Sequence, residues 1–253
     1  MQKFSNIVKL SIIVLMYISV PVLLFTYDDF LLLLVGAFLI SIPINAFAFS
    51  TVYHKLFAHR TFSPKTWVPY IGTLLAVLIM LPSPRTFLSQ HRLHHKFSDT
   101  EYDPHSPKFG KLSTFFPYFF KSTGNKNCNE NIRKNVSKDF AKDYPVLNQL
   151  SDNAAFLIFT MFNIGLLLLG VDFFIFSMLV CLVNLILHGY ANTFFHEFQR
   201  NGEVTIINKP MGAKFISPEF NHARHHELAS SYDFSTPDAK DWMVPIIERF
   251  LKK

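Results

Sequence analysis

The chain has 253 residues, of which 50% are hydrophobic and 16% aromatic. This composition is more apolar than that of an ordinary soluble domain, and the positive mean hydropathy of +0.23 indicates a membrane protein. Its two cysteines, Cys128 and Cys181, lack CxxC spacing and argue against a disulfide framework or a thiolate metal site. The formal net charge of +6 suits an anionic lipid surface or an acidic partner, and we expect no nucleic acid partner.

Four apolar runs are candidates for crossing a bilayer, whose hydrocarbon core of about 30 Å needs about 20 helical residues. They cover about residues 7–27, 30–53, 153–169 and 173–196. Two short connections join neighbouring runs, and neither connection contains Lys or Arg. We therefore predict four transmembrane helices arranged as two hairpins, within a single domain that covers residues 1–253.

The basic residues all lie on one side of these four runs. Of the 24 Lys and Arg residues, two precede or begin the first run, fourteen lie at positions 54–152 and eight follow the fourth run. Because Lys and Arg accumulate on the cytoplasmic side, we expect a multi-pass membrane protein with both termini in the cytoplasm. Residues 54–152 and 197–253 would form a cytoplasmic cap, and the bacterial inner membrane is favoured over the endoplasmic reticulum.

A fifth apolar stretch, at about residues 67–81, is flanked by prolines and is only 15 residues long. If this stretch crossed the membrane, the histidines before and after it would lie on opposite faces and could not share a site. A helix that lies in the interface or re-enters the same face keeps them together. We therefore predict an interfacial or re-entrant helix.

Nine of the eleven histidines fall into four groups along the chain. These groups are His54 and His59; His91, His94 and His95; His196; and His222, His225 and His226. Side chains three or four residues apart share a helix face, whereas adjacent side chains point about 100° apart. His94 and His95 should therefore serve different metals or different sides of one cluster. The five-residue step from His54 to His59 suits either two centres or a local break in the helix.

Nine imidazoles are too many for one metal ion and suit two. Imidazole binds zinc, copper, iron and nickel, so the ligand type alone does not identify the metal. A hydrolytic zinc site usually has three protein ligands and a carboxylate base, and this chain lacks an HExxH motif. The nine neutral ligands favour redox iron used for oxygen chemistry. A surface helix could explain one HxxHH motif, but not all four groups on one membrane face.

The histidine motifs resemble those of the membrane fatty-acid desaturase family, closest to its stearoyl-CoA desaturase branch. YHKLFAHRTFS at residues 53–63 is similar to the first histidine box, and HRLHHKFSDTEYDPHS at residues 91–106 is similar to the second. NTFFH at residues 192–196 is similar to the N-x3-H of the last span, and HARHH at residues 222–226 has the spacing of the third box. The resemblance covers most of residues 30–235.

This resemblance implies an all-α membrane protein, in which four transmembrane helices lie beneath a cytoplasmic helical cap with a histidine-rich di-iron site. The implied iron ligands are His54, His59, His91, His94, His95, His196, His222, His225 and His226. Asn192 would reach an iron through a water molecule. The implied activity is oxygen-dependent fatty acyl desaturation, which introduces a cis double bond into a long saturated acyl chain. Two non-haem irons would be the cofactor and O2 the co-substrate.

The implied partners are a long acyl substrate, membrane lipid and an external electron donor. Gln90 stands where the acyl-CoA branch often has Asp, and residues that hold a CoA head group are not recognisable. The acyl carrier is therefore either acyl-CoA or an acyl-lipid. We expect no fused haem-binding domain, so electrons would come from a ferredoxin or a cytochrome with its reductase. An acidic carrier would suit the basic cytoplasmic face.

Five polar residues are candidates for contacts next to the ligands. His188 lies two turns before His196 and would either contact a ligand or the substrate, or simply bond a neighbouring helix. His105 and Asp103, in the sequence DPH, would contact the substrate or a ligand. One acid among Asp99, Glu101 and Asp103 would accept a hydrogen bond from the free ring nitrogen of a ligand histidine.

Phe38 and Ile42 are candidates for the far end of a substrate tunnel. They precede His54 by four-residue steps on roughly one helix face, together with Ala46 and Ser50. Either side chain would then limit the length of the acyl chain. Plain helix packing explains both residues equally well.

Two other functions are compatible with the residues. A di-iron hydroxylase, ketolase or decarbonylase that acts on a lipid or hydrocarbon would use the same ligands and differ in its product. A non-enzymatic metal-binding membrane protein, such as a transporter, would instead place ligands along a path through the spans. The clustering of nine histidines at one predicted face favours an enzyme.

Overall fold

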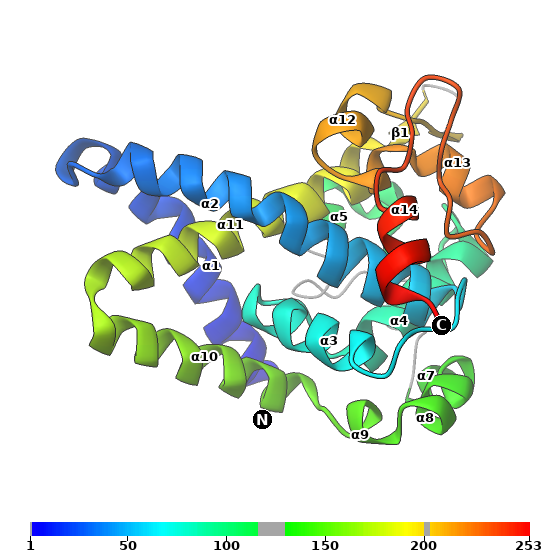
Figure 1. Ribbon diagram of the computed structural model, residues 1–253, viewed down its shortest axis with the longest axis horizontal. Helices are drawn as coiled ribbons and strands as arrows, with labels where there is room; N and C mark the ends of the chain where they lie inside the picture. The colour runs from blue at the N-terminus through cyan, green and yellow to red at the C-terminus, as the bar shows by residue number, and fades with distance from the viewer. Residues whose placement is uncertain (1, 116–129, 200–202) are drawn as a thin grey trace.

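The computed structural model describes residues 2–115, 130–199 and 203–253. The described part is mostly helical, with long helices at one end and shorter elements at the other (Figure 1). Residues 116–129, which include most of an aromatic run and Cys128, lie outside the described residues, as do residues 200–202. The predicted cap is therefore described only in part.

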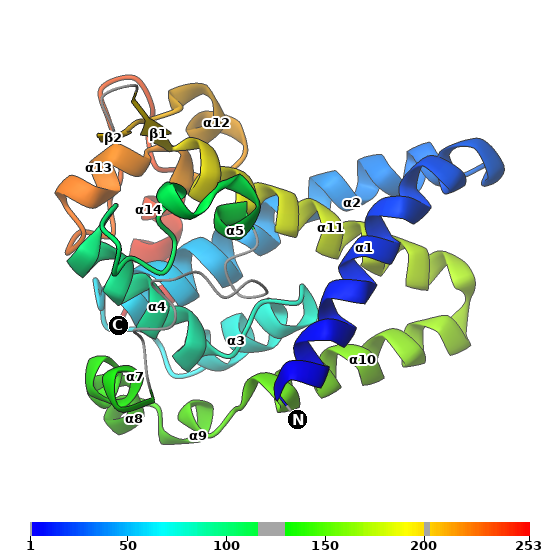
Figure 2. The ribbon, with the colours of Figure 1, turned by 180° about the vertical axis from the view of Figure 1, so that it is seen from behind.

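Long helices form the end of the molecule that we predicted to lie in the membrane. They are α1 (Gln2–Thr26), α2 (Phe30–Ile44), η1 (Asn45–Ala58), α10 (Asp152–Leu169) and α11 (Val171–Phe194). The helix of α2 runs on into η1 without interruption, and this combined helix packs along α11 (Figures 1 and 2).

Three of these helices are long and apolar enough to cross a membrane: the combined helix of α2 and η1, α10, and α11. The apolar part of α1, Leu10–Thr26, is shorter than these three helices. Membrane-crossing length is thus found for three of the four predicted spans. The first span, at about residues 7–27, stays a prediction.

Two helices end a few residues away from the ends of the predicted apolar runs, and the membrane boundaries themselves stay a prediction. The second run ends at residue 53, but the helix continues to Ala58, and its last fourteen residues form a π-helix. The fourth run should end at His196, but α11 ends at Phe194. His196 instead begins strand β1 (His196–Phe198), which pairs antiparallel with β2 (Val204–Ile206). This small hairpin also means that the region predicted to form a helical cap is not purely helical.

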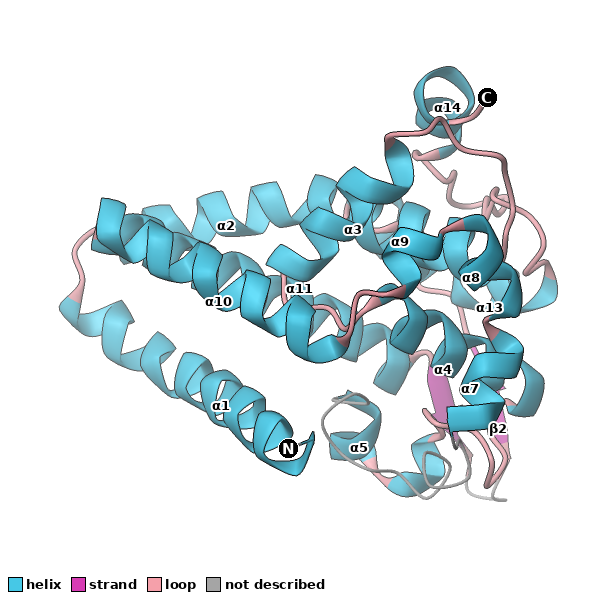
Figure 3. Ribbon diagram, turned by 90° about the horizontal axis from the view of Figure 1, so that it is seen from below, coloured by secondary structure: helices cyan, strands magenta, loops and turns pink. Residues whose placement is uncertain are grey.

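The other end of the molecule is built from short elements, seen to the right of the long helices in Figure 3. They are α4 (Pro84–Phe97), η2 (Pro107–Phe109), α5 (Lys111–Phe115), α7 (Glu130–Val136), α8 (Lys138–Asp143), α9 (Pro145–Asn148), α12 (Pro210–Phe215), η3 (Pro218–Phe220), α13 (His222–Glu227), α14 (Val244–Ile246) and η4 (Ile247–Leu251). Helix α3 (Val68–Leu78) lies instead against η1 and α10. It forms within the apolar stretch at about residues 67–81, and its interfacial or re-entrant position stays a prediction.

Helix α4, which carries three of the nine histidines, is anchored to the first residue of α10. The carboxylate of Asp152 accepts a hydrogen bond from the backbone N–H of Ser83 at 2.8 Å and one from the hydroxyl of Thr86 at 2.9 Å. Both donors lie at the N-terminus of α4, where backbone amides lack helical partners and negative charge is favourable. The contact therefore ties the position of the histidines on α4 to a long helix.

Gly72 of α3 lies directly against Val52 of η1, where a Cβ atom would overlap the Val52 side chain. Val52 is fully buried, so neither helix has free space into which to move. We expect Gly72→Ala to lower the free energy of unfolding by about 1–3 kcal/mol through overpacking. Gly165→Ala in α10 is the matched control, because nothing lies within 4 Å of the new Cβ.

The control substitution should be neutral or stabilise by up to about 1 kcal/mol, since alanine favours the helix over glycine. Thermal unfolding of both variants in the same detergent compares them directly. Equal stability of the Gly72 and Gly165 variants would contradict the close contact between α3 and η1.

Candidate metal centre

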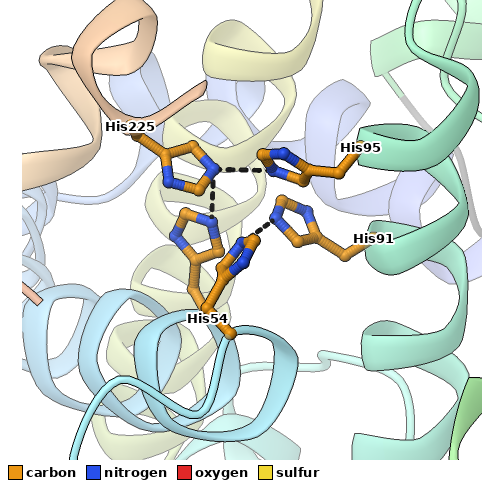
Figure 4. A group of neighbouring side chains, drawn as sticks. His54, His91, His95 and His225 are labelled. Atoms are coloured by element: carbon orange, nitrogen blue, oxygen red, sulfur yellow. Dashed lines mark hydrogen bonds between the residues drawn. The ribbon is translucent and has the colours of Figure 1, made fainter. Parts of the chain in front are cut away.

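The first histidine group consists of His54, His59, His91, His95 and His225, whose ring nitrogens all lie within 4.8 Å of one another. Figure 4 shows the rings of four of them, from η1, α4 and α13, turned toward a common point. Nε2 of His225 lies 3.0 Å from Nε2 of His54 and 2.8 Å from Nε2 of His95. The Nε2 atoms of His59 and His91 are 2.9 Å apart.

The second group consists of His94, His196, His222 and His226, again with ring nitrogens within 4.8 Å of one another. They come from α4, the start of β1 and α13. Nε2 of His222 lies 3.0 Å from Nε2 of His196 and 3.2 Å from Nε2 of His226. All nine predicted histidines are thus brought together, in two groups of five and four.

The spacing of these nitrogens fits metal coordination. Imidazole binds a metal such as zinc at about 2.0–2.1 Å, so two ligands at a right angle would place their nitrogens about 3 Å apart. The observed Nε2 separations of 2.8 to 3.2 Å have this size. Several imidazoles that all direct Nε2 to one point cannot satisfy each other by hydrogen bonds alone, because a neutral ring has one donor and one acceptor. The donor set of each group therefore fits one metal ion.

Helix geometry explains how neighbouring histidines divide between the groups. In α4, His91 and His95 are four residues apart and join the first group, while His94 points to the second. In α13, His222 and His226 are four residues apart and join the second group, while His225 points to the first. Side chains four residues apart share a helix face, so each helix supplies both groups.

The π-helical turns of η1 explain why His54 and His59 belong to one group. On an α-helix, residues five apart would point about 140° from each other. A π-helix closes its hydrogen bonds between residues i and i+5, and the N–H of His59 donates to the carbonyl of His54 at 3.1 Å. The two histidines thus join one group without a break in the helix, because its hydrogen bonds follow the π pattern.

Three carboxylates lie against the outer ring nitrogens of the histidines. Nδ1 of His94 is 2.9 Å from Oδ2 of Asp103, and Nδ1 of His196 is 3.1 Å from Oδ1 of Asp99. Nδ1 of His54 is 2.7 Å from Oε2 of Glu219. A carboxylate at Nδ1 holds the proton there, which leaves the Nε2 lone pair free to bind a metal.

Burial and the surrounding imidazoles keep most of these histidines neutral. Burial first, and the neighbouring histidines second, lower the pKa of His95 to about 2 and hold the pKa values of His91, His222 and His225 well below their usual value. Neutral imidazole is the form that binds metals. Burial also acts to lower the pKa of His94, but the attraction and hydrogen bond of Asp103 outweigh it and raise that pKa.

The other predicted polar residues lie beside the two groups. Nδ2 of Asn192 and Nε2 of His188 are 3.3 Å apart, and His188 packs edge-on against Phe49 at 4.6 Å between ring centres. His105 is buried with its ring centre 5.7 Å from that of His94, and its backbone N–H donates to Asp103 at 2.8 Å. The roles of these residues stay predictions.

The two predicted tunnel residues lie on α2. Phe38 is 39% exposed, and Ile42 is half-buried. Both lie in the apolar part of this helix. Their effect on acyl chain length stays a prediction.

The geometry agrees with a comparison to known protein families. The sequence model of the family named "Fatty acid desaturase" matches residues 28–250. The chain belongs to the fatty acid desaturase family. The resemblance predicted from the histidine boxes is therefore confirmed, and the match includes both histidine groups.

Several desaturases share segments of this family member's sequence. Delta-9 acyl-lipid desaturase 2 of Arabidopsis thaliana is 40% identical over 67 residues, which is 26% of this chain and 22% of that protein. Delta-9 acyl-lipid desaturase 1 of the same plant is 35% identical over 72 residues, covering 28% and 24%. The sn-1 stearoyl-lipid 9-desaturase of Synechocystis sp. is 32% identical over 74 residues, covering 29% and 23%. The matches thus span about a quarter of the length of these relatives.

Some important residues of this desaturase-family site were not predicted from the sequence. Glu219 precedes the third histidine box by three residues, and no motif separates it from an ordinary surface acid. Arg92, which follows His91 directly, points inward. Its guanidinium donates to the carbonyls of Phe57 and Ala58 and to the Asp139 carboxylate. It therefore joins α4 to the end of η1 and to α8.

The outer carboxylates should control metal affinity in this desaturase-family protein. We expect Asp103→Asn and Glu219→Gln each to weaken metal binding by about 10–100-fold, because the paired histidine loses its fixed tautomer and orientation. Competition with a chromophoric chelator measures this affinity. Glu101→Gln is the matched control, since Glu101 lies in the same segment but is exposed. Unchanged affinity in both carboxylate variants would contradict their assigned role.

Proposed function

We propose that this protein is an oxygen-dependent fatty acyl desaturase that introduces a cis double bond into a long saturated acyl chain. The observation that carries the proposal is the division of nine histidines into two metal-sized groups, in a chain of the fatty acid desaturase family. Three helices of membrane-crossing length adjoin this centre, as expected for a substrate that is itself a lipid.

The proposed cofactor is a pair of non-haem irons. His54, His59, His91, His95 and His225 would hold one iron, and His94, His196, His222 and His226 would hold the other, with Asn192 reaching an iron through water. When bound, the irons would supply the O2-dependent chemistry that oxidises the acyl chain by removing one hydrogen from each of two neighbouring methylenes. The protein would hold the ligand rings in place through Asp99, Asp103 and Glu219. Five of the nine rings are buried and four are half-buried, which limits the access of water to the centre.

The proposed orientation has four spans, both termini in the cytoplasm and the metal centre at the cytoplasmic face, within one domain. The asymmetric distribution of Lys and Arg supports this topology, and the bacterial inner membrane is the favoured location. Electrons would come from a ferredoxin or cytochrome-type carrier with its reductase. Because relatives are named acyl-lipid and stearoyl-lipid desaturases, we propose an acyl-lipid substrate rather than acyl-CoA.

Expression in a desaturase-deficient host, followed by mass spectrometry of its lipids, tests this function. Desaturation predicts acyl chains that have lost two hydrogens, and a His94→Ala variant made at the same level should lose this product. A hydroxylated chain in place of the unsaturated one would establish the di-iron hydroxylase instead. Unchanged lipids, with protein that binds metals other than iron, would indicate a non-enzymatic metal-binding protein.

The same host tests whether Phe38 and Ile42 limit the length of the substrate. Replacing both by alanine removes bulk at the proposed end of the tunnel, so the product profile should shift toward longer chains. Met161→Ala, at an exposed apolar position on α10, is a control for general effects within the spans. An unchanged chain-length profile in the double variant would remove these residues from the proposal.

A further inference from the structure

Helix α12 exposes large apolar side chains on the outside of the cap. Met211 is 67% exposed and Phe215 is 66% exposed. We infer that α12 lies in the head-group layer of the membrane, so that Met211 and Phe215 bring the cap into contact with lipid. The inference builds on the proposed membrane orientation and names a lipid contact of the cap outside the spans.

The residues of α12 divide into an inner and an outer face. Ala213 is fully buried, and a Cβ at Gly212 would overlap the ring of Phe220, so this side of the helix packs against η3. Met211, Lys214 and Phe215 are exposed, and their spacing of three and four residues places them on one face. Large apolar side chains that gather on one exposed face are rare where a protein faces water, and they mark sites of contact with a partner or a membrane.

Aromatic contacts place α12 beside the end of α11. Phe220, on which Gly212 rests, stacks on Tyr190 of α11 at 6.1 Å between ring centres, and Tyr190 lies 4.9 Å from Phe194. Tyr190 and Phe194 are 37% and 39% exposed. Figures 1 and 2 both show α12 next to the C-terminal end of α11. The outer face of α12 therefore continues the exposed apolar surface of a span.

The length of α11 places this contact at the boundary of the hydrocarbon layer. From Val171 to Tyr190 the helix rises about 29 Å, and to Phe194 it rises about 35 Å. The hydrocarbon core is about 30 Å thick. If α11 enters the core at Val171, the other boundary lies near Tyr190. Phe194 and the adjoining α12 then lie in the head-group layer.

Helix α3 indicates the same boundary on another side of the molecule. Trp67 and Tyr70 at its start are 45% and 47% exposed, and aromatic rings of this kind accumulate at membrane interfaces. The ring of Trp67 lies 6.1 Å from that of Phe47. Phe47 is about 25 Å along the helix from Phe30, which again is close to one hydrocarbon thickness.

Basic side chains around α12 complement an anionic lipid surface. Lys214 is exposed on the same face as Met211 and Phe215, and Lys111 of α5 extends over the ring of Phe194 at 5.6 Å from its centre. Lysines near an interface lay their apolar stems on the hydrocarbon side and direct the ammonium group to phosphates. The combination of exposed apolar and basic side chains thus matches a bilayer surface.

Spin labelling of the full-length protein in vesicles of phosphatidylcholine and phosphatidylglycerol tests this inference. Cys128 is replaced by serine, buried Cys181 is left in place, and a nitroxide is attached to Met211→Cys or Phe215→Cys. Oxygen dissolves in the bilayer and a charged or hydrated nickel chelate stays in water, so power saturation reports which medium surrounds the label. We expect both labels to collide more with oxygen than with nickel.

Two further labels calibrate the measurement. Leu157→Cys on α10 is 60% exposed in a span and should show oxygen contact, whereas Glu227→Cys at the end of α13 is highly exposed and should show nickel contact. A label at position 215 that behaves like the label at position 227 would overturn the inference. The readout requires neither bound iron nor turnover, so this failure differs from an unchanged lipid profile, which would count against the proposed function.

Discussion

Lys55→Met is expected to lower the free energy of unfolding by about 3–5 kcal/mol, because it leaves the carboxylate of Asp241 buried without a counter-charge. Nζ of Lys55 lies 2.5 Å from Oδ2 of Asp241, and both side chains are fully buried. Removing one partner of a buried ion pair costs far more than removing one partner at the surface. Unfolding by heat or denaturant in a fixed detergent measures the difference.

The position of this ion pair makes it important for the metal centre as well. Lys55 follows His54 directly and lies 4.5 Å from the centre of the Phe234 ring. That ring in turn lies 4.7 Å from the ring of His225. Asp241 also accepts hydrogen bonds from the backbone N–H groups of Phe234 and Met243. The pair therefore fixes the C-terminal segment behind the first histidine group.

Two comparison variants separate the buried charge from other effects. Lys55→Met combined with Asp241→Leu removes both charges and should recover a large part of the lost stability. Lys209→Met breaks a surface pair with Glu197, whose side chains are 39% and 49% exposed, and should change stability by at most about 1 kcal/mol. Equal free energies of unfolding for the Lys55→Met and Lys209→Met variants would contradict the large contribution of the buried ion pair to stability.

His94→Ala and His95→Ala are expected to remove different metals, although the two residues are adjacent. His94 belongs to the group of four and His95 to the group of five. Each variant should therefore retain about one metal per chain where the native protein binds two. Loss of a ligand should reduce desaturation by more than the roughly 10–100-fold expected for an outer carboxylate. Metal analysis and lipid profiles measure the two effects.

His105→Ala is the control for this pair of variants. Its ring is buried 5.7 Å from that of His94, but His105 belongs to neither group. We expect this variant to keep both metals. Spectroscopy of the metal that remains in the His94 and His95 variants should show two different ligand environments. The same environment in both variants would contradict the division into two groups.

The part of the site that follows from local helix geometry could be predicted from the sequence. The angle of about 100° between adjacent helical residues predicts that His94 and His95 point to different sides, and the structure places them in different histidine groups. Hydropathy locates the long helices, and it places their ends within a few residues. The step from His54 to His59 could not be interpreted from the sequence. Residue spacing does not distinguish an α-helix from the π-helix that contains His54 and ends directly before His59.

Contacts between distant parts of the chain could not be predicted. Glu219 reaches His54 across 165 positions, and Asp241 reaches Lys55 across 186. Neither acid lies in a motif, and burial decides their importance. The inward contact of Arg92 could not be predicted for the same reason, since its partner Asp139 lies 47 residues away. Only tertiary packing turns these charged residues into internal contacts.

The metal content of the purified full-length protein tests the central claim most directly. Expression with iron supplied, followed by elemental analysis and an independent determination of protein concentration, gives the metal per chain. The two histidine groups predict two irons per chain in protein that desaturates lipids. Active protein that contains a single iron per chain, or another metal in place of iron, would contradict the account.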